Sequence, residues 1–356
     1  MPFALGIDIG GTFTKIVALA ADRSVLAEGR VPTLSADGPP PLVARAADAA
    51  RKMCADLGLA LGAAAAGTGA TAAAGAAARA GAAAGVGAAA RVGAAAGVGV
   101  GVAGLVDRAT GVLVACPNLP GWEGFHGAEA FSTALGIPAV VENDASVAAL
   151  AEATLGAGRG RDPVALLTLG TGVGGGLVIG GRIVHGRRGF AGEFGHMALT
   201  VDGGPRCACG ARGCVEAFLR SSHVVARALE LAANLPDPPT PVLARALASG
   251  EATARSVGEA ARQGDPVALA VFTELGRHLG MAIANVISAL NPEAVIVGGG
   301  VALAGDVLID TARTTALARV MPPLAEDVVI LPAELGDRGG MLGAALLALG
   351  ERPTGS

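Results

Sequence analysis

The segment FALGIDIGGTFTKIVALA, residues 3–20, decides the fold that we expect for this chain of 356 residues. A short apolar run ends in a glycine pair, and a second apolar run begins after Thr12, which predicts two antiparallel strands joined by a tight turn. The segment SVLAEGRV, residues 24–31, predicts a third strand. The same order returns in PVALLTLGTGVGGGLVIGGRIVHG, residues 163–186. We interpret the two copies as an internal duplication, with one copy at the start of each half of the chain.

Helical periodicity surrounds these strand units. Apolar residues recur at spacings of three and four, which predicts helices at residues 41–56, 145–155, 223–233 and 266–290. The segment VIVGGGVAL, residues 295–303, has the pattern of a buried strand that runs into glycines before a helix. The chain then offers the apolar run VVILPAEL and the closing helix MLGAALLALG. Strands that alternate with helices predict an α/β fold with largely covered sheets.

Composition narrows the class of protein. Charged residues make up 16% of the chain and the net charge is −4, which does not favour binding to a nucleic-acid backbone. Residues 57–78 carry no charge over the length of a membrane span, but they are nearly all Ala and Gly, so we do not predict a membrane helix. No signal-peptide pattern opens the sequence, and we expect a cytoplasmic protein. The low-complexity Ala/Gly stretch at 62–97 predicts a frayed helix or a partly disordered insertion without function.

Three of the five cysteines lie close to a histidine. His196, Cys207, Cys209 and Cys214 follow the spacing H-x10-C-x-C-x4-C, and four N and S donors of this kind suit tetrahedral zinc. Such a closed set predicts a structural site, and the alternative is a group of reduced, buried cysteines. The remaining cysteines and histidines are isolated in sequence and are expected at core or surface positions: Cys54, Cys116, His126, His185, His223 and His278.

The segment DIGGT, residues 8–12, is a candidate phosphate site. Glycines at positions 10 and 11 let backbone N–H groups approach a phosphate without obstruction by a Cβ atom, and Thr12 adds a hydroxyl. Asp8, at the expected strand end, is placed to hold a hydrated Mg²⁺ beside that phosphate. The alternative is an ordinary tight hairpin in which the aspartate is a turn residue.

The segment LGTGVGGG, residues 169–176, repeats this idea in the second half. Gly170, Gly172 and Gly175 fit the spacing of a dinucleotide-binding fingerprint, but a strand pattern follows where that fingerprint needs a helix. We therefore reject the dinucleotide interpretation and retain a second phosphate-facing hairpin.

The segment VVENDASVAALAE, residues 140–152, places polar groups at another strand end. An apolar strand ends at Glu142, Asn143 and Asp144, and a helix begins there. Asp144 is at the least a preferred helix N-cap. It also lies where open α/β sheets bind ligands, and it fits a group that accepts a proton from a substrate hydroxyl.

Taken together, five motifs resemble the sugar kinases of the ROK family (repressor, open reading frame, kinase). They are DIGGT, PNLPGW at 117–122, ENDA at 142–145, LGTGVGGG at 169–176, and GEFGH with CACGARGCVE between 192 and 216. The resemblance covers about residues 5–349, except the Ala/Gly stretch. It implies a duplicated ribonuclease-H-like fold of the actin and hexokinase type, with two lobes around a cleft. Residues 1–134 and 336–350 would form the small lobe, and residues 135–335 the large lobe with the zinc loop and the nucleotide-binding segment.

The resemblance also implies roles for individual residues. Asp144 would be the catalytic base, and Asp8 would hold Mg²⁺ through water. One ring nitrogen of His196 would bind structural zinc while the other faces a sugar hydroxyl. The implied sugar-binding residues are Asn118, Asn143, Asp144, Glu193, His196 and Glu216. The implied ATP-binding residues are Asp8, Gly10, Gly11, Thr12, Lys15, Gly170, Thr171, Gly172, Gly174, Gly298, Gly299 and Gly300.

The implied activity is transfer of the ATP γ-phosphoryl group to the 6-hydroxyl of glucose, since LPGW and ENDA resemble glucokinases most. N-acetylglucosamine, N-acetylmannosamine, mannose and fructose stay open as substrates, and polyphosphate stays open as a donor. A sugar-sensing regulator is the alternative, but no basic helical segment precedes Asp8, so we expect no DNA binding. The family also implies a homodimer.

Overall fold

The computed structural model describes residues 2–61 and 93–350. The first sheet has the order β3-β2-β1-β4-β7. Its antiparallel strands are β1 (Phe3–Ile9), β2 (Phe13–Ala20) and β3 (Val25–Pro32), and β4 (Ala95–Val102) and β7 (Ala139–Asn143) continue it in parallel with β1. Of the Ala/Gly stretch, positions 62–92 lie outside the described residues, and its last three positions begin β4 rather than a helix or an insertion.

The second sheet repeats this topology in the order β10-β9-β8-β11-β12. Its antiparallel strands are β8 (Val164–Leu169), β9 (Val173–Ile179) and β10 (Arg182–Ile183), and the parallel strands are β11 (Ala294–Gly298) and β12 (Val329–Pro332). The predicted duplication is therefore confirmed, with the two hairpins as β1–β2 and β8–β9. The strand expected through residue 186 stops at Ile183, because the chain then turns through residues 185–192.

Helices cover both faces of the first sheet. In β2, Ile16 and Ala18 pack into the same core as α1 (Pro39–Asp56), while Val17 and Leu19 pack with α11 (Gly339–Gly350) on the opposite face. The helix α2 (Gly127–Leu135) follows a small hairpin of β5 (Leu105–Asp107) and β6 (Val112–Ala115). This alternation along β2 is what a covered sheet requires.

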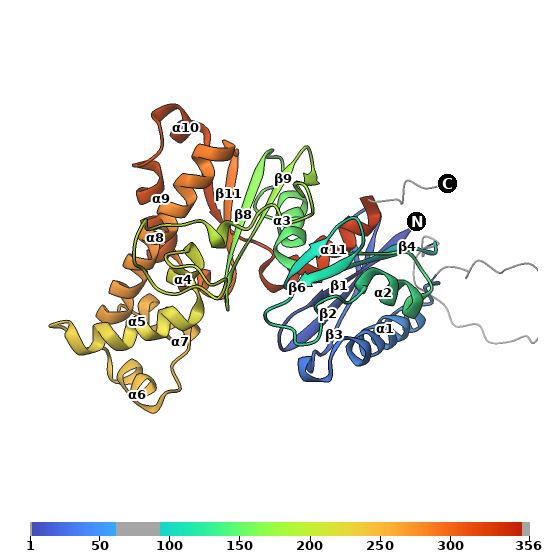
Figure 1. Ribbon diagram of the computed structural model, residues 1–356, viewed down its shortest axis with the longest axis horizontal. Helices are drawn as coiled ribbons and strands as arrows, with labels where there is room; N and C mark the ends of the chain where they lie inside the picture. The colour runs from blue at the N-terminus through green and yellow to red at the C-terminus, as the bar shows by residue number, and fades with distance from the viewer. Residues whose placement is uncertain (1, 62–92, 351–356) are drawn as a thin grey trace, which may run out of the picture.

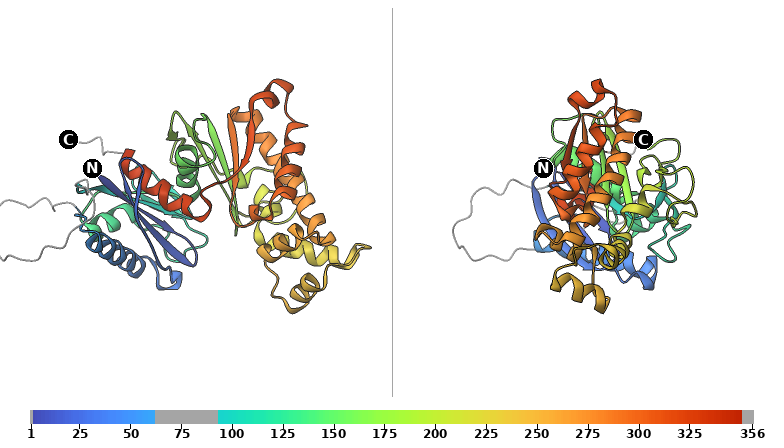
Figure 2. Two further views of the ribbon diagram at one scale, coloured as in Figure 1. Left: turned by 180° about the vertical axis from the view of Figure 1, so that it is seen from behind. Right: turned by 90° about the vertical axis from the view of Figure 1, so that its left-hand side faces the viewer.

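The helices α3 (Asp144–Leu155) and α11 lie between the two sheets (Figures 1 and 2). A Cβ atom at Gly343 of α11 would lie 1.7 Å from the backbone oxygen of Val147 in α3, so only glycine permits this approach. Because β7 belongs to the first sheet and α3 packs on β8 and β9, the chain passes between the halves at Asn143–Asp144. The predicted lobe division at 134/135 and 335/336 stays a prediction, and we propose to place the first boundary after Asn143.

The second half carries the larger helical layer. It contains α4 (Val215–Leu219), α5 (Ser221–Asn234), α6 (Pro241–Ser249), α7 (Ala254–Arg262), α8 (Pro266–Leu290), α9 (Asp306–Leu317) and α10 (Pro322–Asp327). Short 3-10 turns occur at Ser35–Asp37, Phe194–His196, Ala302–Ala304 and Gly336–Arg338. The four predicted helices are confirmed as α1, α3, α5 and α8. Asp265 caps α8 by accepting a hydrogen bond from the N–H of Ala268 at 2.8 Å.

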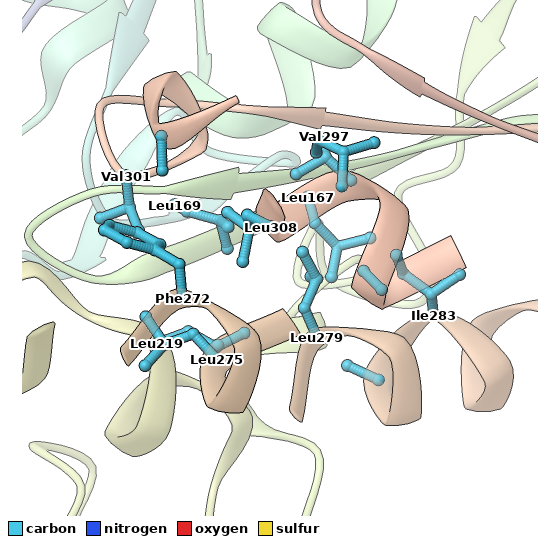
Figure 3. Packing of buried hydrophobic residues seen from close by; sticks show 14 of the residues in the cluster. Leu167, Leu169, Leu219, Phe272, Leu275, Leu279, Ile283, Val297, Val301 and Leu308 are labelled. Carbon is cyan, nitrogen blue, oxygen red and sulfur yellow. The ribbon is translucent and has the colours of Figure 1, made fainter. Parts of the chain in front are cut away.

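Figure 3 shows how α8 packs in this core. Phe272, Leu275, Leu279 and Ile283 point from α8 toward strand residues such as Leu167 and Val297. Among the described residues, α8 is the one helix long and apolar enough to cross a membrane, and 61% of that apolar window is buried inside the protein. Burial of this kind is typical of a core helix.

Candidate functional site

Asn143 and Asp144 stand where the chain passes between the halves. Asn143 caps α3, since its Oδ1 accepts a hydrogen bond from the N–H of Ser146 at 3.0 Å and its Nδ2 donates to the Gly104 oxygen at 3.1 Å. Loss of solvation raises the pKa of Asp144, although a hydrogen bond from the N–H of Ala145 acts against it. A carboxylate that protonates more readily than usual is suited to accept a proton from a hydroxyl group.

Asp8 lies at the same junction. Burial first, and then repulsion from Asp144, raise the pKa of Asp8 to about 7, while the Lys15 charge acts in the opposite direction. A Cβ atom at Gly101 would lie 3.6 Å from the Cα of Asp144 and 3.8 Å from Oδ1 of Asp8, so this glycine leaves room between the two acids. Lys15 is held by Asp337, with 3.2 Å between Nζ and Oδ2. The structure therefore brings Asp8, Lys15 and Asp144 together.

The predicted zinc ligands converge. The donor atoms of His196, Cys207, Cys209 and Cys214 all lie within 4.8 Å of one another. The Sγ atoms of Cys209 and Cys214 are 3.8 Å apart, and Nδ1 of His196 is 3.7 Å from Sγ of Cys207. Tetrahedral zinc with Zn–S bonds of about 2.3 Å separates its sulfur ligands by about 3.8 Å. The donor set and its spacing therefore fit a closed zinc site.

Glu193 lies on the other side of the His196 ring, with 3.8 Å between Nε2 and Oε2 of Glu193. Burial is the largest cause that raises the pKa of Glu193; the His196 charge lowers it, and the charges of Asp144 and Glu216 raise it further. These four side chains therefore share one electrostatic neighbourhood, although they come from β7–α3, the 3-10 turn Phe194–His196 and α4.

Glu216 connects the cysteine cluster to the second glycine hairpin. Its Oε2 accepts a hydrogen bond from the N–H of Val173 at 3.1 Å, and its Oε1 lies 3.3 Å from Sγ of Cys207. A Cβ atom at Gly172 would lie 2.5 Å from Oε2 of Glu216. Asn118, by contrast, lies exposed on the surface.

The predicted phosphate-binding hairpins expose their tips. Thr12 and Thr171 are exposed at the β1–β2 and β8–β9 turns. The third glycine cluster lies beside the second, since the N–H of Val301 donates to the Leu169 oxygen at 3.0 Å. Gly299 has φ +88°, and a Cβ atom there would lie 2.3 Å from the same oxygen, so the close approach requires glycine.

A cavity of about 150 Å³ adjoins this third cluster. Gly300 and Leu303 line one side of it, and Arg255, Glu259 and Arg262 of α7 line the other. Sequence reasoning missed the α7 residues, because charged residues on a helix are usually solvent-facing and nothing in their spacing points to Gly300.

His185 was predicted at a core or surface position, since it is isolated in sequence. It is partly buried, and its Nε2 lies 2.7 Å from Oε2 of Glu142, whose side chain is only 3% exposed. Sequence spacing did not reveal this contact, because the two residues meet through packing of the two halves. His223 and His278 both contact the Phe218 ring, as expected for histidines near the core.

Comparison with known proteins decides the family. The model of the ROK family matches residues 83–351. The chain belongs to the ROK family.

A glucokinase of Halalkalibacterium halodurans is 32% identical over 344 residues, which cover 96% of this chain and 94% of that protein. The crystal structure of a ROK family glucokinase from Streptomyces griseus, in complex with glucose and AMPPNP, has a TM-score of 0.73 and 31% identity, covering 97% of this chain and 98% of that one. A ROK hexokinase from Thermus thermophilus has a TM-score of 0.71 at 29% identity and covers 97% of both chains. This ROK chain therefore has the duplicated two-lobe fold that its motifs predicted.

Proposed function

We propose that this ROK protein is an ATP-dependent hexose kinase, a glucokinase that phosphorylates the 6-hydroxyl of glucose. The observation that carries the proposal is the convergence of Asp144 with Glu193, His196 and Glu216. The glucokinase names of its relatives and the bound glucose and AMPPNP of the Streptomyces griseus enzyme support the choice of sugar and donor.

Asp144 is the proposed general base. Its carboxylate accepts the proton of the sugar hydroxyl as that oxygen attacks the γ-phosphorus, while the bond from this phosphorus to the β–γ bridging oxygen breaks and ADP leaves. Proton transfer of this kind contributes about 10²–10⁴-fold to a rate. The cap at Asn143 and the hydrogen bond from the Ala145 N–H fix the start of α3, so the base stands on a rigid element.

The two glycine hairpins are the proposed phosphate sites. Backbone N–H groups around Gly10–Thr12 and Thr171–Gly174 surround the phosphates from both halves of the molecule. Mg²⁺ supplies charge neutralisation at the β- and γ-phosphates. Burial and repulsion from Asp144 raise the pKa of Asp8 to about 7, which fits a carboxylate that a neighbouring cation would stabilise in its charged form.

The cysteine cluster is proposed to hold structural zinc. When bound, zinc supplies a rigid closure of the loop 196–214. The chain's own residues then orient the sugar: Nε2 of His196 and the carboxylates of Glu193 and Glu216 offer polar groups to hydroxyls.

The cavity between α7 and Gly300 is the proposed site for the nucleoside end of ATP. It adjoins the third glycine cluster, which contacts the end of β8 and so continues from the second phosphate hairpin. Arg255, Glu259 and Arg262 are the charged side chains that line this cavity.

The decisive experiment measures kcat/KM for glucose, N-acetylglucosamine, N-acetylmannosamine, mannose and fructose with ATP and Mg²⁺, through coupled detection of ADP. We expect glucose to give the highest value. A higher value for another hexose would identify that hexose as the substrate in place of glucose, and no turnover of any hexose would refute the proposed kinase function. Replacing ATP with polyphosphate in the same assay tests the donor, and sedimentation velocity tests the expected homodimer.

A further inference from the structure

The pair His185–Glu142 is a buried contact that the proposed mechanism does not use. Nε2 of His185 lies 2.7 Å from Oε2 of Glu142, and the side chains are 15% and 3% exposed. Buried acids and bases of this kind are costly unless they are paired, because each has lost its water. The pair also joins the halves, since Glu142 is the last residue but one of β7 in the first sheet, while His185 follows β10 of the second.

Each partner holds a segment that leads to a proposed site residue. The Oε1 atom of Glu142 accepts a hydrogen bond from the Asn143 N–H at 2.8 Å, directly before Asp144. The backbone oxygen of His185 accepts hydrogen bonds from the N–H groups of Gly189 at 3.1 Å and Ala191 at 3.2 Å, which closes the turn leading to Glu193. One side-chain contact therefore connects the segment of the base to the segment of a sugar ligand.

The same turn has further contacts with the first half. The Arg188 guanidinium lies 3.1 Å from Oδ2 of Asp107, and the Arg108 N–H donates to the Arg188 oxygen at 3.2 Å. These contacts lie on the β5–β6 hairpin and are more exposed than the His185–Glu142 pair. Exposed ion pairs contribute little to stability, so the buried pair is the one expected to fix the geometry.

The chemistry of the imidazole sets which substitutions can replace it. Nε2 of His185 contacts Oε2 of Glu142 and also lies 2.8 Å from Nη1 of Arg108. A ring nitrogen has one in-plane position for hydrogen bonding, and guanidinium is a donor only, so Nε2 serves one partner at a time. An Nε2–H that donates to the carboxylate is the charge-assisted, stronger arrangement. A glutamine side chain offers a similar N–H, whereas phenylalanine offers none.

We propose that His185 and Glu142 are positioning residues: their contact joins the end of β7 to the segment after β10 and thereby fixes Asp144 and Glu193 relative to each other. The proposal rests on the proposed sugar kinase function. Neither side chain is required to touch the sugar. Their effect is on the distance between the base and a sugar ligand, and a misplacement of about 1 Å in an active site costs about 10²-fold in rate.

The test compares His185→Phe, Glu142→Leu, the double variant and His185→Gln. Both single variants are expected to lower kcat/KM for the sugar at least about tenfold. The double variant is expected to lose no more kcat/KM than the more impaired single variant, because the two substitutions remove the same contact. His185→Gln is expected to stay within about threefold of wild type. Sugar affinity is followed separately by the fluorescence of Trp122, the single tryptophan, which lies in the PNLPGW segment.

Controls separate this role from a merely structural one. All assays run well below the melting temperature of every variant, with zinc content measured in parallel. His126→Phe, a matched change at an exposed histidine, is expected to leave kcat/KM unchanged. If His185→Phe does not fold, the proposal is tested by comparing kcat/KM for the sugar between Glu142→Leu and His185→Gln.

Three results would overturn the proposal: unchanged kcat/KM in His185→Phe, additive losses in the double variant, or a loss in His185→Gln equal to that in His185→Phe. A wild-type protein that phosphorylates no hexose would instead refute the proposed function, and the positioning role with it.

Discussion

The Nε2 atom of His196 lies 3.8 Å from Oε2 of Glu193, on the side of the imidazole that does not face Cys207. Nδ1 of the same ring faces the cysteine cluster. A metal bound at Nδ1 would therefore fix the ring orientation and leave Nε2 directed toward the proposed sugar site. The proposed structural metal and the proposed sugar recognition would therefore meet in this one side chain.

Cys209→Ser is expected to lower the zinc content well below that of wild type and to raise the sugar KM at least about tenfold, because the loop that carries His196 loses its anchor. Elemental analysis and steady-state kinetics measure both. Cys54→Ala is the matched control, since Cys54 lies in the core of the first half. Fully active protein that contains no zinc would contradict the structural site.

Asp144→Asn is expected to lower kcat by at least about 10²-fold with little change in sugar KM, since the amide keeps the shape of the side chain but cannot take a proton. The coupled ADP assay measures kcat, and Trp122 fluorescence measures sugar binding. Asp56→Asn, on the exposed end of α1, is the control. Near-normal turnover in Asp144→Asn would remove this residue from the role of base.

Much of this molecule follows from local sequence patterns. The hairpin β1–β2 and helix α8 were predictable because apolar periodicity and glycine turns act over short distances. The cysteine cluster was predictable because its four ligands lie within one segment. The contact of His185 with Glu142 and the cavity between α7 and Gly300 were not, because each depends on how segments distant in sequence pack together.

Acid sensitivity is expected from His278 and His223. Burial lowers the pKa of both below 6.5, so the folded protein resists protonation that the unfolded chain accepts. Below about pH 6.5 the unfolded state binds more protons, and the free energy of unfolding therefore falls as the pH falls. His278→Phe keeps the ring that stacks on Phe218 and removes a titrating group whose Nδ1 is buried without a hydrogen-bond partner.

This variant is expected to lose less stability than wild type between pH 7.5 and pH 5.5. Thermal melting across that range measures the difference. His126→Phe, at an exposed position, should follow the wild-type curve. If the melting temperature of His278→Phe falls with pH as steeply as that of wild type, burial of this histidine does not cause the loss of stability at acidic pH.

Gly340→Ala tests the position of Asp8. A Cβ atom at Gly340 would lie 2.6 Å from Cγ of Asp8 and 2.7 Å from its Oδ2, so the carboxylate must move. Overpacking of this kind costs about 1–3 kcal/mol, and we expect kcat/KM for Mg·ATP to fall at least about fivefold while sugar affinity is unchanged. Alanine is also more stable than glycine in a helix by about 0.5–1 kcal/mol, which offsets part of the strain. A small change in melting temperature should therefore accompany a large change in kcat/KM for Mg·ATP.

Gly29→Ala is the control, because a Cβ atom there meets nothing within 4 Å. Unchanged ATP kinetics in Gly340→Ala would mean that Asp8 does not need its observed position, and its proposed role beside the phosphates would be lost.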